Sequence, residues 1–335
     1  MTLPDPMALP APPELLRALL VGTYAMHVVA LGLLVSGLWL RVGAEWSRKA
    51  TYKIETVHRF GVVGLSMVIT TAVAPLLFVQ VLYGRFFYAS SITIGYPWLA
   101  VVGYLMVGFY SLYLWRWRWD RTGGPSAQGK AFLILTILCV FAVGFTISWN
   151  HLLSLAAAPW ATRVSHPHIV LRLGGYLGSI LIAAAAWLSW LRTRLWTTGG
   201  DRSATAAAVV GGALLIAWSL LSAHADTSWA GAGRILQWAA AILAVIAAAT
   251  GIARTARLSA WIATVAAVAG SLGMALQRES YRLAVLGGEY TTGPVNAQWG
   301  PLAMFLIFLV AGLATLVWIV RVIRRPEVSS AAPSP

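Results

Sequence analysis

Nine apolar stretches, each long enough to cross a bilayer, make up most of this chain, and its Lys and Arg residues gather in alternate connections between them. Hydrocarbon about 30 Å thick requires about twenty consecutive apolar residues of an α-helix. The strands of a β-barrel would show shorter segments of alternating polarity instead. The sequence therefore predicts an all-α, polytopic bundle of transmembrane helices in contact with the lipid bilayer.

Composition points the same way. The chain is 59% apolar and only 10% charged, whereas soluble domains carry about a quarter charged residues. The formal net charge of +14 follows from basic residues that hold loops on the cytoplasmic side. No basic folded module is present that would bind nucleic acid. With Cys139 as its single cysteine, the chain has neither a disulfide framework nor a thiolate metal site.

The nine predicted spans form one helical bundle over residues 15–325. We place them at 15–40, 59–83, 93–115, 131–156, 168–191, 204–224, 233–252, 257–276 and 300–322. The flanking segments 1–14 and 326–335 are predicted to be disordered tails. The N-terminal segment has neither the basic start nor the small-residue cleavage site of a signal peptide, so we expect the first span to be retained.

The basic residues also predict an orientation. Most of the 24 Lys and Arg residues fall in the first, third, fifth and seventh connections and in the C-terminal tail. Such segments stay in the cytoplasm, which places the N-terminus outside and the C-terminus inside a bacterial cytoplasmic (inner) membrane. Two longer connections, 157–167 and 277–299, then lie on the outer side. The second is expected to begin as an extension of the eighth helix and to turn at Gly287-Gly288. Each is either a functional loop or an interfacial segment that rests on lipid headgroups.

Three of the six His residues are candidate cofactor ligands. His27 lies near the middle of the first span, where an ionisable or metal-binding group is costly and is therefore a functional candidate. His151, late in the fourth span, and His224, at the end of the sixth, lie near the outer side. Two imidazoles from facing helices at one depth can ligate haem b, a condition that His151 and His224 can meet. The alternative for a His at a helix end is a solvated or interfacial residue, and the alternative for an inner His is a structural hydrogen bond.

Two further groups of polar residues are candidates at the outer side. The first group follows the eighth span and is expected to form a surface for a quinone head group or a docking partner: Arg278, Glu279, Tyr281 and Arg282. The second group, His166 and His168 together with His224, is a candidate zinc or copper site, although no set spacing of the three supports it.

Other features bear on transport and hydrolysis. Pro75 removes a helix hydrogen bond and should kink the second span, and broken helices mark substrate paths in transporters. The acidic residues map to loops, tails or helix ends, whereas ion-coupled carriers bury Asp or Glu at mid-depth. The chain has no phosphate loop, HExxH motif or Ser nucleophile elbow. These observations favour cofactor binding or a scaffold over a carrier or a hydrolase.

Part of the chain carries a family resemblance. Residues 72–99, AVAPLLFVQVLYGRFFYASSITIGYPWL, resemble a group of largely uncharacterised polytopic bacterial membrane proteins that are associated with respiratory cytochrome gene clusters. The first span with His27, and residues 295–306, VNAQWGPLAMFL, are similar to the same group. More loosely, the chain resembles the large subunit of cytochrome bd-type quinol oxidases. It lacks their GRQPW-like segment and their long loop between the sixth and seventh spans.

Three functions are consistent with these residues. The first, which the resemblance implies, is an integral subunit of a respiratory electron-transfer complex. Such a subunit would bind haem b or quinone near the outer face and work with other membrane or periplasmic subunits such as cytochromes. The second is a cofactor-free membrane anchor or scaffold for a periplasmic partner. The third is a permease for a metal or small solute. The uneven distribution of His residues places the candidate chemistry in the outer half of the bundle.

Overall fold

The computed structural model describes residues 8–47, 54–156, 166–195, 203–221, 228–252, 256–286 and 295–323. Within these ranges the chain forms nine helices: α1 Pro13–Ser47, α2 Ile54–Ile94, α3 Tyr96–Thr122, α4 Ala127–Ala156, α5 His166–Leu195, α6 Ser203–Leu221, α7 Ser228–Ile252, α8 Ala256–Leu286 and α9 Trp299–Ile323. Eight of them are long and apolar enough to cross a membrane, and α9 contains a shorter apolar run, Trp299–Thr315. The prediction of an all-α, multi-pass membrane bundle is confirmed.

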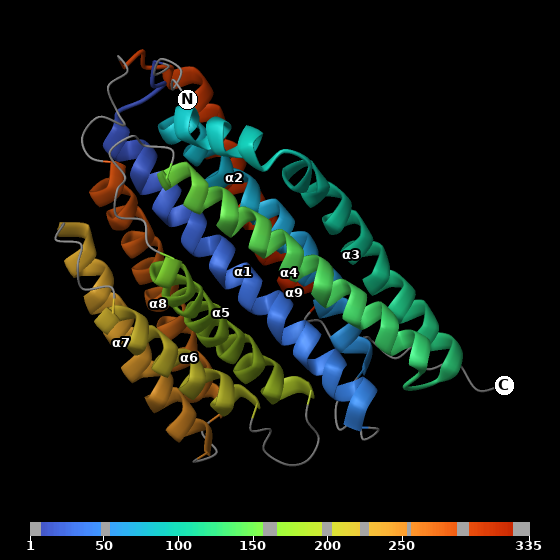
Figure 1. Ribbon diagram of the computed structural model, residues 1–335. Helices are drawn as coiled ribbons and strands as arrows, with labels where there is room; N and C mark the ends of the chain where they lie inside the picture. Colours follow the sequence, from blue (N-terminus) through green and yellow to red (C-terminus); the bar gives the residue numbers. More distant parts are fainter. Residues whose placement is uncertain are drawn as a thin grey trace.

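Helix α1 runs between two groups of helices (Figure 1). On one side, α2 packs along α1, and α3 packs along α4. On the other side, α5, α6, α7 and α8 form a four-helix group in which α5 and α8 both also contact α1. The bundle has one end where α1 begins and α8 ends, and we call it the predicted outer end. The opposite end is the predicted inner end.

Small residues bring the helices of the four-helix group close together. Its core is rich in Ala, with Ile182 and Leu215 among the few larger side chains. A Cβ atom on Gly178 of α5 would lie 2.9 Å from the carbonyl oxygen of Gly211 on α6. Because lipid tails are as apolar as Leu side chains, close packing of small residues is a main source of helix association in a membrane.

A small residue also brings α1 close to the four-helix group. At Gly32 of α1, an added Cβ atom would lie 2.7 Å from the carbonyl carbon of Ala183 on α5. Residues around this contact, such as Leu33 and Leu188, are almost completely buried. The two groups of helices therefore meet backbone to backbone at this point of the bundle.

Helix α2 is broken at Tyr83, the residue inside this helix with non-helical backbone angles, φ −126° and ψ 26°. The chain changes direction there and continues as helix to Ile94, across the predicted outer end (Figure 1). We expect the kink at Pro75 and the end of the span at residue 83, whereas the break lies eight residues beyond Pro75. Gly84 follows the break, and Gly is a common residue at sharp helix bends.

The N-terminal segment packs against the start of α9. The backbone N–H groups of Asn296 and Gln298 donate to the carbonyl oxygens of Leu9 and Pro10, both at 2.8 Å. Leu9 is buried in an apolar cluster with residues of α2 and α8. Residues 8–12 therefore make defined contacts and are not the disordered tail that the sequence predicts for 1–14. Residues 1–7 and the predicted tail at 326–335 lie outside the described residues.

At the predicted inner end, a buried acid joins three helices. The indole Nε1 of Trp115 on α3 donates to Oε1 of Glu45 on α1 at 2.8 Å. The backbone N–H of Ser126, just before α4, donates to Oε2 of Glu45 at 3.1 Å. A carboxylate at the start of a helix is stabilised by the helix dipole. Glu45 therefore ties the turn between α3 and α4 to α1.

Candidate functional site

Helix α8 continues for ten residues beyond the predicted end of its span at 276, and its last turns carry Arg278, Glu279, Tyr281 and Arg282. Glu279 and Arg282 are each only 2% exposed. Residues three apart lie on the same face of a helix, and here that face is turned into the bundle. Burial of Glu279 and Arg282 counts against the partner-docking alternative for these two residues; the quinone-head alternative stays a prediction. Tyr281 is half-buried and packs against an apolar cluster.

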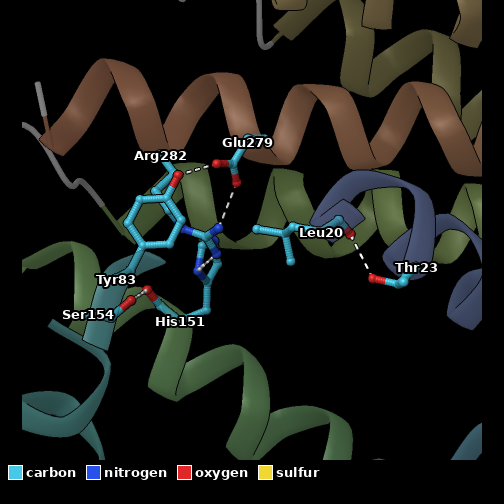
Figure 2. A network of polar contacts seen from close by, with 7 residues as sticks. All are labelled: Leu20, Thr23, Tyr83, His151, Ser154, Glu279 and Arg282. Atoms are coloured by element: carbon cyan, nitrogen blue, oxygen red, sulfur yellow. Dashed lines mark hydrogen bonds and ion pairs between the residues drawn. The ribbon is translucent and has the colours of Figure 1, made fainter. Parts of the chain in front are cut away.

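The buried pair belongs to a network that joins α8, α2 and α4, which we call the Glu279 network: Tyr83, His151, Glu279 and Arg282 (Figure 2). Arg282 Nη1 donates to Oε2 of Glu279 at 2.7 Å. The hydroxyl of Tyr83 donates to the other carboxylate oxygen. The guanidinium carbon of Arg282 lies 4.5 Å from the ring centroid of Tyr83. Every side chain of this network is buried.

The position of His151 bears on haem ligation. Nη2 of Arg282 lies 3.3 Å from Nδ1 of His151. Arg has donors only, so Nδ1 accepts this hydrogen bond and the neutral ring carries its proton on Nε2. Ligating His residues instead donate one ring N–H to a carboxylate or carbonyl and bind the metal through the other nitrogen. In this arrangement both nitrogens of His151 are engaged or protonated, so the residue does not fit an axial haem ligand.

His27 has the opposite arrangement. Its Nδ1 lies 3.3 Å from Oγ1 of Thr71 on α2. The Thr71 hydroxyl donates to the carbonyl oxygen of Met67 at 2.7 Å, so it accepts from the imidazole. Nδ1 of His27 is therefore the protonated nitrogen, and Nε2 keeps the lone pair that can accept a hydrogen bond or bind a metal. Thr71 thus sets the tautomer of the mid-span imidazole.

A second set of polar and aromatic side chains surrounds the same stretch of α1, and we call it the Tyr24 cluster: Tyr24, His27, Tyr176 and Arg278. The ring centroids of Tyr24 and Tyr176 of α5 lie 6.2 Å apart, edge to face. The ring of His27 lies 6.4 Å from that of Tyr24. The guanidinium carbon of Arg278 from α8 lies 4.4 Å from the Tyr24 ring centroid. The cluster therefore stands where α1, α5 and α8 meet.

The two sets differ in access and in charge. All four side chains of the Tyr24 cluster are half-buried, whereas the Glu279 network is closed. In the described part of the chain, no carboxylate forms an ion pair with Arg278, while Glu279 is paired with Arg282. The Nε atom of Arg278 is buried and has no hydrogen-bond partner among the described residues. Arg278 is thus a cation whose main described neighbour is an aromatic face.

The candidate residues predicted from sequence separate between these two sets. His27 and Arg278 flank Tyr24, and His151 joins Glu279 and Arg282. His224 lies outside the described residues. His166 and His168 lie in the first turn of α5, but their side chains, like that of His224, are outside the description. Among the described residues no group of three or more His, Cys, Asp or Glu could hold a metal ion.

Tyr24, Tyr83 and Tyr176 are members of the two sets that sequence reasoning did not single out. Tyr24 precedes His27 by three residues, so both lie on one face of α1, and this spacing was a usable signal. Tyr83 and Tyr176 carry no such signal, because a Tyr in an apolar span usually serves as an interfacial anchor.

Comparison with protein-family models, curated protein sequences and solved structures finds no match for this chain.

Proposed function

We propose that the protein is an integral subunit of a membrane electron-transfer complex and that the Tyr24 cluster binds the head group of a quinone or quinol. The observation that carries the proposal is Arg278 placed over Tyr24, 4.4 Å from its ring centroid. Tyr24 in turn lies beside His27 and Tyr176. This gives one guanidinium, two phenols and an imidazole around one place in the predicted outer half of the bundle.

These groups match the chemistry of a quinone ring. The carbonyl oxygens of a quinone accept hydrogen bonds, and the Arg278 guanidinium and the Tyr hydroxyls can donate them. The hydroxyl of a quinol donates, and Nε2 of His27 can accept. Ligand sites that combine apolar walls with a few convergent polar groups are the usual form of small-molecule sites. The Tyr24 cluster has this composition.

Access from the lipid also favours a quinone. The four side chains of the cluster are half-buried on helices that cross the membrane, so a polar ring with an apolar tail can reach them from the hydrocarbon. The closed Glu279 network offers no such access. Haem b at His151 is not part of the proposal, because Arg282 donates a hydrogen bond to Nδ1 of the His151 ring. The resemblance to proteins of respiratory cytochrome clusters supports the bacterial inner membrane and a cytochrome partner as the setting.

The proposal is tested by measuring the quinone that co-purifies with the protein in mild detergent, by solvent extraction and chromatography. Wild type should retain quinone, and Arg278→Gln and Tyr24→Phe should retain much less. Arg85→Gln is the matched control, because Arg85 is also a half-buried arginine whose guanidinium lies over an aromatic ring, that of Phe86 at 4.9 Å. No quinone in wild type, or equal quinone in wild type and Arg278→Gln, would refute the proposed function.

A further inference from the structure

We infer that the Tyr24 cluster binds its quinoid ligand preferentially as an anion, so that a ring with an ionised hydroxyl binds more tightly than a neutral ring of the same size. This inference rests on the proposed function and goes further, because it names the charge of the ligand. The observation behind it is the balance of charges at the outer end of α8, where two arginines and one carboxylate lie within five residues.

The single carboxylate is fully engaged elsewhere. Both oxygens of Glu279 accept hydrogen bonds, one from Arg282 at 2.7 Å and the other from Tyr83. Its partner Arg282 also reaches His151. Among the described residues, no ion pair joins Glu279 to Arg278. Glu279 forms its ion pair with Arg282 and attracts Arg278 only at longer range. With two arginines and one carboxylate, this end of α8 keeps a net positive charge.

The aromatic face of Tyr24 compensates Arg278 only in part. A ring quadrupole attracts a cation more weakly than a carboxylate at hydrogen-bond distance does, and it does not satisfy the directional N–H donors of a guanidinium. The buried Nε of Arg278 has no acceptor among the described residues. A half-buried cation without a paired anion loses part of its hydration without full compensation. A ligand oxygen that carries negative charge would supply both the charge and the missing acceptor.

Two other sources could supply the same negative oxygen. The acids Asp226 and Glu289 belong to connections at the predicted outer end and lie outside the described residues. Phosphate groups of the outer lipid leaflet are the other source. A quinoid anion is the ligand we favour, because Tyr24 and Tyr176 offer ring faces and His27 offers a hydrogen-bonding nitrogen beside Arg278, which suit a flat polar ring.

The test compares two ligands that share a naphthoquinone ring and differ in charge and by one methyl group. The purified full-length protein, in nanodiscs of phosphatidylcholine, is titrated with 2-hydroxy-1,4-naphthoquinone, whose hydroxyl is ionised at neutral pH, and with its neutral 2-methoxy analogue. The measured quantity is the ratio of the two Kd values, in wild type, Arg278→Gln and Arg85→Gln. Comparing ratios between variants removes the difference in bilayer partition between the ligands. The fold of each variant is checked by circular dichroism.

Loss of a charge-assisted hydrogen bond corresponds to roughly tenfold or more in affinity. The ratio should therefore shift by at least about tenfold against the anion in Arg278→Gln, and it should stay at the wild-type value in Arg85→Gln. An unchanged ratio in Arg278→Gln overturns the inference while the proposed function stands, provided that both ligands bind wild type. Binding of neither ligand refutes both.

A loop acid or a lipid phosphate beside Arg278 would each give a different result in this experiment. If a loop acid already neutralises Arg278, then Asp226→Asn or Glu289→Gln will shift the ratio toward the anion, and the inference is overturned. If lipid phosphate fills the site, Arg278→Gln will lower the number of phospholipids that co-purify with the protein while leaving the ratio unchanged, which also overturns it. The inference is supported if neither loop variant shifts the ratio and the phospholipid content is the same in wild type and Arg278→Gln.

Discussion

Arg282 and Glu279 stand one helical turn apart on α8 and form an ion pair of 2.7 Å in which the two side chains are only 3% and 2% exposed. A buried pair of this kind adds little net stability over apolar residues of the same shape, because both charges lose their water. Removing one partner destabilises the fold strongly, because the other charge then stays buried without a counter-charge. The pair is therefore a sensitive point in the fold, and Tyr83 and His151 depend on it for their positions.

We expect Glu279→Gln to destabilise the protein by about 3 kcal/mol, because it leaves the Arg282 cation without a paired charge in a closed site. The free energy of unfolding is measured by titration with denaturing detergent. The chain provides a matched control in Arg17 and Glu14, which form the same i,i+3 pair at 3.3 Å with Glu14 73% exposed. Glu14→Gln should cost less than about 1 kcal/mol. Equal losses in the two variants would contradict the account of the Glu279 network.

Tyr83→Phe keeps the ring under Arg282 and removes only the hydroxyl that donates to Glu279. We expect a loss of about 1–3 kcal/mol, because a buried carboxylate oxygen is left without its donor. The loss should vanish when Tyr83→Phe is introduced into Glu279→Gln if the hydroxyl acts mainly on the carboxylate charge. Additive losses in a double-mutant cycle would show that the two residues act independently.

Gly32→Ala should destabilise the contact between α1 and the four-helix group, because the new methyl group would meet the backbone of Ala183 at 2.7 Å. Overpacking of this kind costs about 1–3 kcal/mol. The control is Gly103→Ala on α3, where an added Cβ has no neighbour within 4 Å. Because Ala is the better helix former, Gly103→Ala should be neutral or slightly stabilising. Thermal unfolding followed by circular dichroism separates the two results.

Glu45 and Trp115 should be energetically coupled at the predicted inner end. Glu45→Ala removes the acceptor of the Trp115 indole and of the Ser126 N–H, and Trp115→Phe removes one of those donors. Residues in direct contact show coupling energies of about 0.5–3 kcal/mol in double-mutant cycles. A coupling energy indistinguishable from zero would mean that Glu45 acts on α4 alone, through the Ser126 N–H.

The helices and the depth of the key residues follow from the sequence alone. Hydropathy places α1 to α9 to within a few residues at most ends, and it places His27 at mid-span and Arg278 just beyond the eighth span. Hydropathy does not reveal burial where polar residues continue a helix. The run QRESYR at 277–282 continues the eighth helix as expected, but its polarity gives no sign that Glu279 and Arg282 are buried, where their charges satisfy one another within the bundle.

The side chain that each arginine of α8 contacts could not be predicted from the sequence. Arg278 and Arg282 are one turn apart and identical in type, yet Arg278 lies over Tyr24 of α1, whereas Arg282 pairs with Glu279 of α8 itself. Rotation about a helix axis is fixed by packing against several neighbours at once, which a single sequence does not reveal. The same holds for Tyr83, whose hydroxyl reaches Glu279 across 196 positions of the chain.

The position of the proposed quinone site at the Tyr24 cluster can be mapped by photoaffinity labelling. The protein in nanodiscs is irradiated with an azidoquinone, digested and mapped by mass spectrometry, with and without an excess of unmodified quinone. We expect labels that excess quinone displaces on the segments of α1, α5 and α8 around Tyr24, Tyr176 and Arg278, and we expect these labels to be lost in Arg278→Gln. Displaceable labels confined to other helices, or labels that excess quinone does not displace, would contradict this position of the site.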